Sequence, residues 1–154
     1  MVLLVLTAVL TLLADLGTKQ LAQAALTGDR IVAIPGLLAL QLRHNSGIAL
    51  GMMQGNRWAL LVLPLVMLII CWAMLRKYQP TNYMRFAVGL ILGGFAGNYI
   101  ERLVKGYVVD MLYFPFLPWF VCNIADIAVC FGVGLIVISL LLRPQDWREK
   151  NAKD

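Results

Sequence analysis

Two aspartates in the second half of the chain are the residues best suited to chemistry. Asp110 lies in an apolar, aromatic stretch, YVVDMLYFPFLPWF, with no obvious cation beside it, and Asp126 stands at the start of a long apolar segment. Two carboxylates held close together cannot comfortably both ionise, so one keeps its proton. The ionised carboxylate can take a proton from water while the protonated one hydrogen-bonds an amide carbonyl. The pair therefore predicts peptide-bond hydrolysis, with Asp110 and Asp126 as the catalytic residues.

Asp126 also has a purely structural explanation. Asn123 and Asp126 have the spacing of a helix N-cap and its third residue, an N-x-x-D variant of the capping box. A cap of this kind needs no catalytic role. A helix beginning here would favour the anion at Asp126, which makes Asp126 the charged member of the pair.

Other mechanisms lack the residues that they need. His44 is the only histidine and no cysteine lies near it in the sequence, so we interpret it as a loop residue rather than half of a Cys-His pair. The sequence has no HExxH motif and no metal-ligand cluster, and we expect neither a metal nor another cofactor. Cys71, Cys122 and Cys130 show no CxxC spacing, and we interpret them as small buried apolar residues.

The composition indicates a membrane protein. The chain has 154 residues, of which 61% are hydrophobic, and a mean hydropathy of +0.81, which is well above the range of soluble domains. The net charge of +5 comes from basic residues scattered between apolar segments, a pattern that argues against nucleic acid as a partner. At this length we expect one domain, residues 1–154.

The apolar segments predict four transmembrane helices, at about residues 1–26, 58–75, 86–103 and 123–142. Between the first and second helices, LLALQLRHN alternates leucine with other residues after a Pro35-Gly36 turn signal, which is typical of a strand. We therefore expect an all-α membrane protein with a small β element that lies on the membrane. The stretch between the third and fourth helices contains Pro115 and Pro118, which argue against a helix, and its aromatic residues suit the lipid headgroup region.

Four helices in this order bring polar residues from distant parts of the sequence to one end of the bundle. Ionisable residues inside a membrane are costly, so their gathering marks a functional site. The residues are Asp15, Lys19, Asn45, Asn98, Arg102, Asp110, Asn123 and Asp126. Lysine and arginine are nearly balanced between the two sides, but the short basic segments at the helix ends favour cytoplasmic termini and a site near the extracytoplasmic face.

Several members of this group have structural explanations too. Asp15 and Lys19 stand four residues apart with the acid first, the favourable order for an ion pair on a helix. Arg102 can pair with Glu101, with Asp15 or with a substrate carbonyl. The Asn45-Ser-Gly segment is compatible with an ordinary turn. A ridge of small residues, typical of close helix packing, is formed by Gly89, Gly93 and Gly97.

At these residues the chain resembles the lipoprotein signal peptidases, or signal peptidase II family. The resemblance rests on five motifs in register along nearly the whole chain. They are DLGTK at 15–19, NSGIALG at 45–51, GGFAGNYIER at 93–102, VVD at 108–110 and NIAD at 123–126. Residues where the chain departs from the usual family pattern are Leu50, Glu101, Met111 and Cys122.

The resemblance implies a multi-pass aspartic endopeptidase of the bacterial inner membrane, with cytoplasmic termini and an extracytoplasmic β-cradle. Such an enzyme removes the signal peptide of a prolipoprotein on the amino side of the diacylglyceryl-modified cysteine, without a metal. Asp110 and Asp126 match the catalytic dyad of the family. The partners expected are lipid-modified prolipoproteins, membrane lipids and cyclic peptide inhibitors of the globomycin type, and we expect a monomer.

The other site residues are assigned to two roles. Substrate binding is assigned to Asn45, Gly47, Asn98, Arg102 and Asn123, of which all but Gly47 match positions that line the family's substrate and inhibitor pocket. Structural support of the site is assigned to Asp15, Lys19 and Glu101.

Two functions from other classes are open to a chain of this composition. A small proton-coupled membrane transporter would also need carboxylates and an arginine, but it should place them near the midplane, often in paired repeats. Here they gather at one end and no repeat is visible. A non-catalytic membrane scaffold would leave two carboxylates in apolar surroundings as an unexplained cost.

Overall fold

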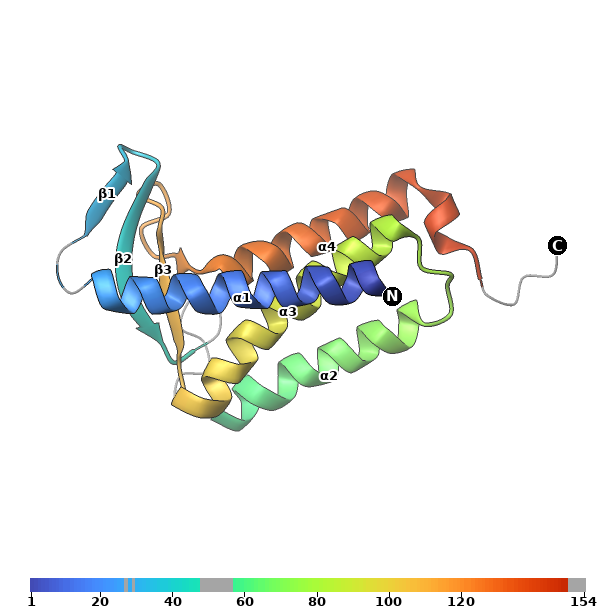
Figure 1. Cartoon of the computed structure of the whole chain (residues 1–154), viewed down its shortest axis with the longest axis horizontal. Coiled ribbons are helices and arrows are strands. Elements are labelled where there is room, and N and C mark those ends of the chain that lie inside the picture. The colour runs from blue at the N-terminus through green and yellow to red at the C-terminus, as the bar shows by residue number, and fades with distance from the viewer. Residues whose placement is uncertain (27, 29, 48–56, 150–154) are drawn as a thin grey trace.

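Four long helices form the body of the part of the chain that the structure describes (Figure 1). The computed structural model describes residues 1–26, 28, 30–47 and 57–149, so the IALG part of the second motif, with Leu50, lies outside the described residues. The helices are α1 (Val2–Ala25), α2 (Arg57–Leu75), α3 (Asn82–Lys105) and α4 (Ile124–Leu142). Helix α3 begins before the expected residue 86 because the Thr81 hydroxyl caps it, accepting a hydrogen bond from the Met84 amide at 3.3 Å.

Two helices in the described residues, α1 and α4, are long and apolar enough to cross a membrane. Helix α2 contains a shorter apolar stretch, Leu60–Ala73. Helix α3 has 24 residues, which corresponds to a length of about 36 Å, but it carries several polar side chains.

The outside of α1 is apolar and its buried stripe is partly polar, the reverse of a helix in a soluble protein. The buried positions follow one face at intervals of three or four residues and pack toward α3. They are Thr7, Thr11, Asp15, Lys19 and Ala22. This stripe delivers Asp15 and Lys19 to the interior of the bundle.

Glycines allow the helices to approach closely, as predicted. A Cβ atom on Gly93 would lie 2.5 Å from the Ala8 carbonyl oxygen of α1. A Cβ atom on Gly94, on the neighbouring stripe of α3, would lie 2.5 Å from the Ala125 carbonyl oxygen of α4. Neither distance is compatible with a methyl group, so α3 is in backbone contact with both neighbours.

A small antiparallel sheet covers one end of the bundle (Figure 1). Its strands, in spatial order, are β1 (Ile31–Ile34), β2 (Leu38–Asn45), β3 (Val108–Tyr113) and β4 (Val121–Cys122). The expected β element between the first two helices is therefore present as the β1–β2 hairpin, which turns at Gly36 with a φ of 72°.

The other half of the sheet comes from the connection between α3 and α4, where the sequence indicated only an aromatic interfacial stretch. Strand β3 pairs with β2 and is buried on both faces. A strand buried on both faces lacks the alternation that identifies a strand in sequence. The sheet thus joins two loops that are far apart in the chain.

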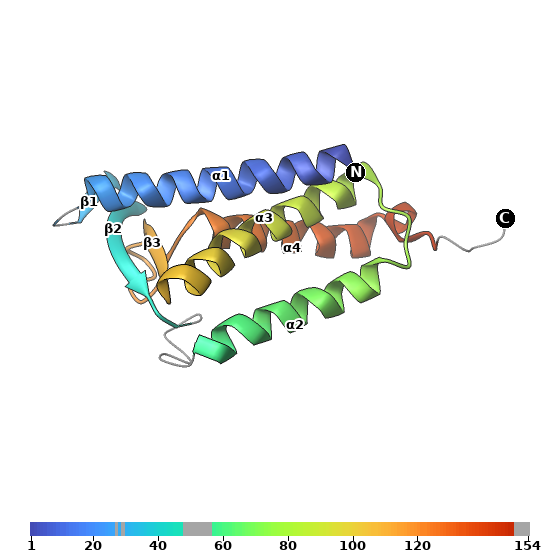
Figure 2. The same ribbon diagram turned by 60° about the horizontal axis from the view of Figure 1, so that its bottom comes forward.

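Helix α2 stands apart from the other three, as Figure 2 shows. A groove of about 1460 Å³ runs between α2, α3 and α4 and reaches the sheet. Cys71 and Cys130 line this groove and are exposed, so our interpretation of them as buried residues is wrong, whereas Cys122 is buried as expected. The separation of α2 from the bundle explains the difference, because a tighter bundle would have covered both thiols.

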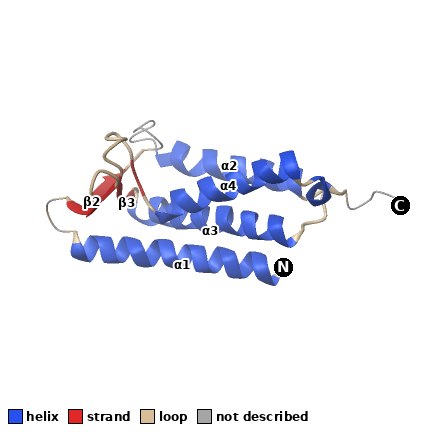
Figure 3. Ribbon diagram, turned by 90° about the horizontal axis from the view of Figure 1, so that it is seen from above, coloured by secondary structure: helices blue, strands red, loops and turns tan. Residues whose placement is uncertain are grey.

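The end of the bundle opposite the sheet holds the N-terminus and the end of α4 (Figure 3). A short 3-10 helix, η2 (Pro144–Trp147), follows α4 there and buries Asp146 completely. The Asp146 carboxylate accepts hydrogen bonds from Thr81 Oγ1 at 2.6 Å and Ser139 Oγ at 2.7 Å, and it pairs with Arg143 at 2.7 Å. These bonds tie the end of α4 to the start of α3, and they lower the pKa of Asp146 against the opposing effect of burial.

Candidate active site

Asp110 projects from the middle of β3 and is 2% exposed. Directly beside it the register shifts: Leu40 pairs with Leu112, whereas Arg43 pairs with Asp110. Two residues of β2 therefore oppose one residue of β3, which is a β-bulge, a feature that commonly redirects a side chain next to a functional site. The Asp110 carboxylate accepts hydrogen bonds from Asn45 Nδ2 at 2.9 Å and Asn123 Nδ2 at 2.7 Å.

Asp126 lies in the first turn of α4, and the predicted capping box is confirmed. The Asn123 side chain accepts a hydrogen bond from the Asp126 amide at 3.0 Å, and the Asp126 carboxylate accepts one from the Asn123 amide at 3.2 Å. The structural explanation of this pair is therefore correct. The capping box does not account for the other hydrogen bonds of the Asn123 and Asp126 side chains, which join them to Asn98 and Asp110.

Asn123 and Asn98 connect the two aspartates. The amide nitrogen of Asn123 donates to Asp110 and also, at 3.1 Å, to the amide oxygen of Asn98. The amide nitrogen of Asn98 donates to Asp126 Oδ1 at 2.8 Å. Two asparagine side chains thus direct donors at two carboxylates, the buried Asp110 of β3 and the half-buried Asp126 of α4.

Below this pair lies a buried ionic cluster of Asp15, Lys19 and Glu101. The Lys19 ammonium is 2.7 Å from Asp15 Oδ2, which confirms the expected pair, and 3.1 Å from Glu101 Oε2. Glu101 also pairs with Lys105 at 2.8 Å. The Lys105 contact has a sequence signal that we did not use, a glutamate four residues before a lysine on one helix.

Arg102 does not pair with Glu101 or Asp15, the two partners within the protein that the sequence suggested. Its guanidinium donates to the Gly47 carbonyl at 3.2 Å, whereas Glu101 and Asp15 both bind Lys19. Gly47 is in turn fixed by the Asn45 side chain, which accepts a hydrogen bond from the Gly47 amide at 3.0 Å. The expected turn is therefore present, and it links Arg102 through Asn45 to Asp110.

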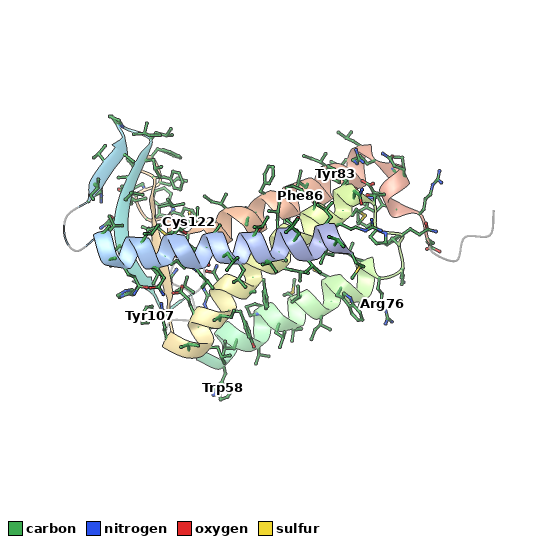
Figure 4. The ribbon with its side chains drawn as sticks, in the orientation of Figure 1. Trp58, Arg76, Tyr83, Phe86, Tyr107 and Cys122 are labelled. Atoms are coloured by element: carbon green, nitrogen blue, oxygen red, sulfur yellow. The ribbon has the colours of Figure 1, made fainter. Side chains whose placement is uncertain are left out.

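His44 lies in strand β2 rather than in a loop, so that interpretation is wrong. Its ring packs against the Tyr107 ring with centroids 4.5 Å apart. In Figure 4, Tyr107 and Cys122 lie at the sheet end of the protein, and Arg76 and Tyr83 lie at the far end.

Burial sets the proton affinity of the groups on the sheet. It raises the pKa of Asp110 to about 6, with the Asp126 charge acting in the same direction and the Asn45 and Asn123 donors acting against it. Burial also raises the pKa of the Cys122 thiol to about 12, which leaves it protonated and unreactive at neutral pH. Asp110 can therefore exist in both protonation states near neutral pH.

All of the expected site residues except Gly47 and the ionic cluster line the sheet end of the groove. They are Asn45, Asn98, Arg102, Asp110, Asn123 and Asp126, with Gly47 held between Arg102 and Asn45. Within the described residues, no group of three or more His, Cys, Asp or Glu side chains could hold a metal ion.

The fold and the site define a helical membrane protein with two neighbouring carboxylates where its bundle meets a small sheet. Each carboxylate accepts at least one hydrogen bond from an asparagine side chain. A sequence model of the family described as signal peptidase (SPase) II matches residues 7–142, which is most of the chain. The chain belongs to this signal peptidase II family.

Individual relatives agree with the family. The lipoprotein signal peptidase of Symbiobacterium thermophilum is 34% identical over 139 residues, covering 88% of this chain and 91% of the relative. That of Shouchella clausii is 36% identical over 118 residues, covering 75% and 77%. A bacterial membrane enzyme solved by the in meso method at 2.3 Å resolution superposes with a TM-score of 0.80 at 29% identity, covering 97% of this chain and 94% of that chain. The family is one of proteases, and it favours neither the transporter nor the scaffold.

Proposed function

We propose that this chain removes signal peptides from prolipoproteins as an aspartic endopeptidase, with Asp110 and Asp126 as its catalytic pair. The observation that carries the proposal is the Asn123 side chain, which caps α4 beside Asp126 while donating to Asp110 at 2.7 Å. This bridge holds a buried and a half-buried carboxylate from different elements at one end of the groove. No other pair of carboxylates in the described residues shares such a bridge within the groove.

The two aspartates divide the chemistry according to their surroundings. Asp126 accepts hydrogen bonds on both oxygens from amide N–H groups and lies at a helix N-terminus, and these two features stabilise its carboxylate form. It takes a proton from water as the water oxygen attacks the scissile carbonyl carbon. Asp110, whose pKa of about 6 allows it to hold a proton, hydrogen-bonds the carbonyl oxygen.

The tetrahedral intermediate then collapses with breakage of the C–N bond. The proton taken from water passes to the departing amine, which is the amino group of the lipid-modified cysteine. The water oxygen remains in the new carboxyl group of the signal peptide. The pair ends with one proton between its two members, as it began.

The groove supplies a place for the rest of the substrate. The signal helix lies between α2, α3 and α4, and the diacylglyceryl chains remain in the bilayer. Asn45, Asn98, Arg102 and Asn123 bind the chain around the scissile bond, and the Gly47 carbonyl orients Arg102. Cyclic peptide inhibitors of the globomycin type bind the same polar end.

We also propose a single domain over residues 1–154, in which all four helices span the bacterial inner membrane. Both termini are cytoplasmic, the site is near the extracytoplasmic face, and the enzyme is a monomer. The arrangement of the helices supports this topology, because the N-terminus and the end of α4 both lie at the end opposite the sheet (Figure 1).

Purified protein should be assayed on a lipidated lipobox peptide, with product identified by mass. Asp110→Asn and Asp126→Asn should each lower kcat by about 10³-fold or more. Asp146→Asn is the matched control, since Asp146 is a buried carboxylate at the other end of the bundle, and this variant should keep its activity below its unfolding temperature. Turnover like the wild type by either dyad variant would remove the proposed pair.

A second substrate tests recognition of the lipid. The same peptide without the diacylglyceryl group should be cleaved far more slowly. Equal rates on both peptides would leave the protease intact and overturn its lipoprotein specificity.

A further inference from the structure

The Asn98 side chain can sit in two orientations related by a flip of its amide, and only one serves the dyad. In the observed orientation the amide nitrogen donates to Asp126 Oδ1 at 2.8 Å. After a flip, the amide oxygen would face the Asp126 carboxylate, and two acceptors would oppose each other. The environment of Asp126 therefore depends on whatever fixes this amide.

Lys19 supplies the constraint. Its ammonium has three donors and no acceptor, and it has three oxygen neighbours: Asp15 Oδ2 at 2.7 Å, Asn98 Oδ1 at 2.9 Å and Glu101 Oε2 at 3.1 Å. Lys19 is 1% exposed, so water offers no substitute. The amide oxygen of Asn98 must face this cation, and its nitrogen must then face Asp126.

The second neighbour of Asn98 enforces the same choice. Asn123 uses its amide oxygen to accept from the Asp126 backbone, so its nitrogen is the atom that reaches Asn98 Oδ1 at 3.1 Å. A flipped Asn98 would oppose donors to donors at both Lys19 and Asn123. Of these two constraints only the one from Lys19 carries a full charge.

The ionic cluster also holds the backbone beside each aspartate. Asp15 Oδ1 accepts a hydrogen bond at 2.9 Å from the amide of Ala125, the residue before Asp126. Glu101 Oε2 accepts one at 3.0 Å from the amide of Val109, the residue before Asp110. Lys19 joins these two carboxylates to each other.

We propose that Lys19 is a positioning residue for the reaction: its ammonium fixes the Asn98 amide so that a donor always faces Asp126. This inference rests on the proposed function and assigns Lys19 a task beyond support of the fold. Its effect on rate passes through Asn98 to Asp126.

A pH signature follows from the charges around Asp126. The charged groups that face it are Lys19 from α1, Arg102 from α3 and Asp110 from β3. Removal of the Lys19 charge takes away one cation and releases the Asn98 donor, so the Asp126 anion loses stabilisation from both. The ascending, acid limb of the pH–rate profile, which requires this anion, should therefore move to higher pH.

Lys19→Met and Lys105→Met form a matched pair, because both lysines bind Glu101 but only Lys19 reaches Asn98. Lys19→Met should lower kcat by about 10²-fold with little change in KM and should move the acid limb. Lys105→Met should keep kcat within about twofold, because Lys105 is 28% exposed and Glu101 keeps its contact with Lys19. Equal effects of the two variants would overturn the proposal.

A double-mutant cycle tests whether Lys19 acts through Asn98. Asn98→Ala alone should lower kcat to a similar extent, and the double variant should be no slower than the slower single variant. Losses that multiply in the double variant would show that Lys19 and Asn98 act independently, against the proposal.

Two further measurements keep the test decisive if Lys19→Met folds poorly. Asp15→Asn/Lys19→Met removes one charge of each sign. Its acid limb should lie at higher pH than that of Asp15→Asn alone, as it does for Lys19→Met relative to the wild type. Infrared titration of the carboxyl band that Asp126→Asn abolishes reads the same group without any cleavage. An unmoved band in an active enzyme contradicts the role of Lys19, whereas a wild type that cleaves nothing contradicts the proposed function.

Discussion

Asp110 is the residue whose surroundings most directly predict behaviour in solution. Burial raises its pKa to about 6, and the Asp126 charge adds to the effect, so the folded protein holds this proton more tightly than a free aspartate does. As the acid of the proposed pair, Asp110 is competent below its pKa and loses its proton as the pH rises through it.

We therefore expect the descending limb of kcat/KM to have a midpoint near pH 6. Initial rates on the lipidated peptide between about pH 4 and 8 measure it. Asn45→Ala removes a donor to the Asp110 carboxylate and should move the limb to higher pH, because the anion is then less stabilised. If the descending limb does not move in this variant, the limb reports the titration of a group other than Asp110.

Asn123 combines two tasks that substitution can separate. Serine retains the helix cap but cannot donate to both Asn98 and Asp110, whereas alanine does neither. Asn123→Ser should lose about 10²-fold in kcat, because it cannot replace both donors. Asn123→Ala should lose as much in kcat and should also be less stable than Asn123→Ser by about 1 kcal/mol, because it lacks the cap.

Thermal unfolding and single-turnover kinetics on the same preparations distinguish the two losses. If Asn123→Ser kept full activity, the bridge between Asn98 and Asp110 would have no part in the chemistry.

At the scale of elements, the contact between α1 and α3 decides whether the ionic cluster can form. Gly97 faces Asp15, and a Cβ atom there would overlap the Asp15 carboxylate. Gly97→Ala should therefore destabilise the protein by about 1–3 kcal/mol and lower activity together with it.

Gly134 of α4 is the matched control, since a Cβ atom there meets no atom within 4 Å. Gly134→Ala should leave activity unchanged and raise stability by about 0.5–1 kcal/mol, the usual gain for alanine in a helix. Chemical denaturation of both variants under one detergent condition makes the comparison.

Local patterns and the gathering of polar residues at one end of the bundle were predictable from the sequence, whereas the individual contacts between elements were not. The capping box at Asn123, the Asp15–Lys19 pair and the glycine ridge each depend on residues three or four apart on one helix. The binding of Glu101 to Lys19 depends on how α1 and α3 are rotated against each other, which no single-helix pattern specifies.

Strand β3 and the position of α2 were missed for related reasons. Strand β3 lacks alternation because both of its faces are covered. The apolar sequence of α2 does not indicate how far this helix lies from α3 and α4. That separation leaves Cys71 and Cys130 exposed.

For the whole molecule, the proposed topology predicts which loops face each side of the membrane. Leu37 on the hairpin is 50% exposed. Gln79, between α2 and α3, is also exposed and lies at the end of the bundle opposite the sheet. In a cysteine-free background, Leu37→Cys should react with a membrane-impermeant maleimide in intact cells. Gln79→Cys should react only after the membrane is opened.

Labelling of both positions in intact cells would contradict four spans, and the reverse pattern would invert the orientation. Each cysteine variant should first be shown to retain cleavage of the lipidated peptide, so that only folded protein is compared.

The order of the elements along the chain has a consequence for biogenesis. Helix α4 is the last of the four long helices, and Asn123 and Asp126 stand at its start, while α1 to α3 and strand β3 precede it. A chain still emerging from the ribosome therefore has Asp110 but lacks Asp126, the Asn123 bridge and the α4 backbone amide that binds Asp15. We expect the newly made protein to be latent during its own insertion and to become active in a single step, when its final helix docks.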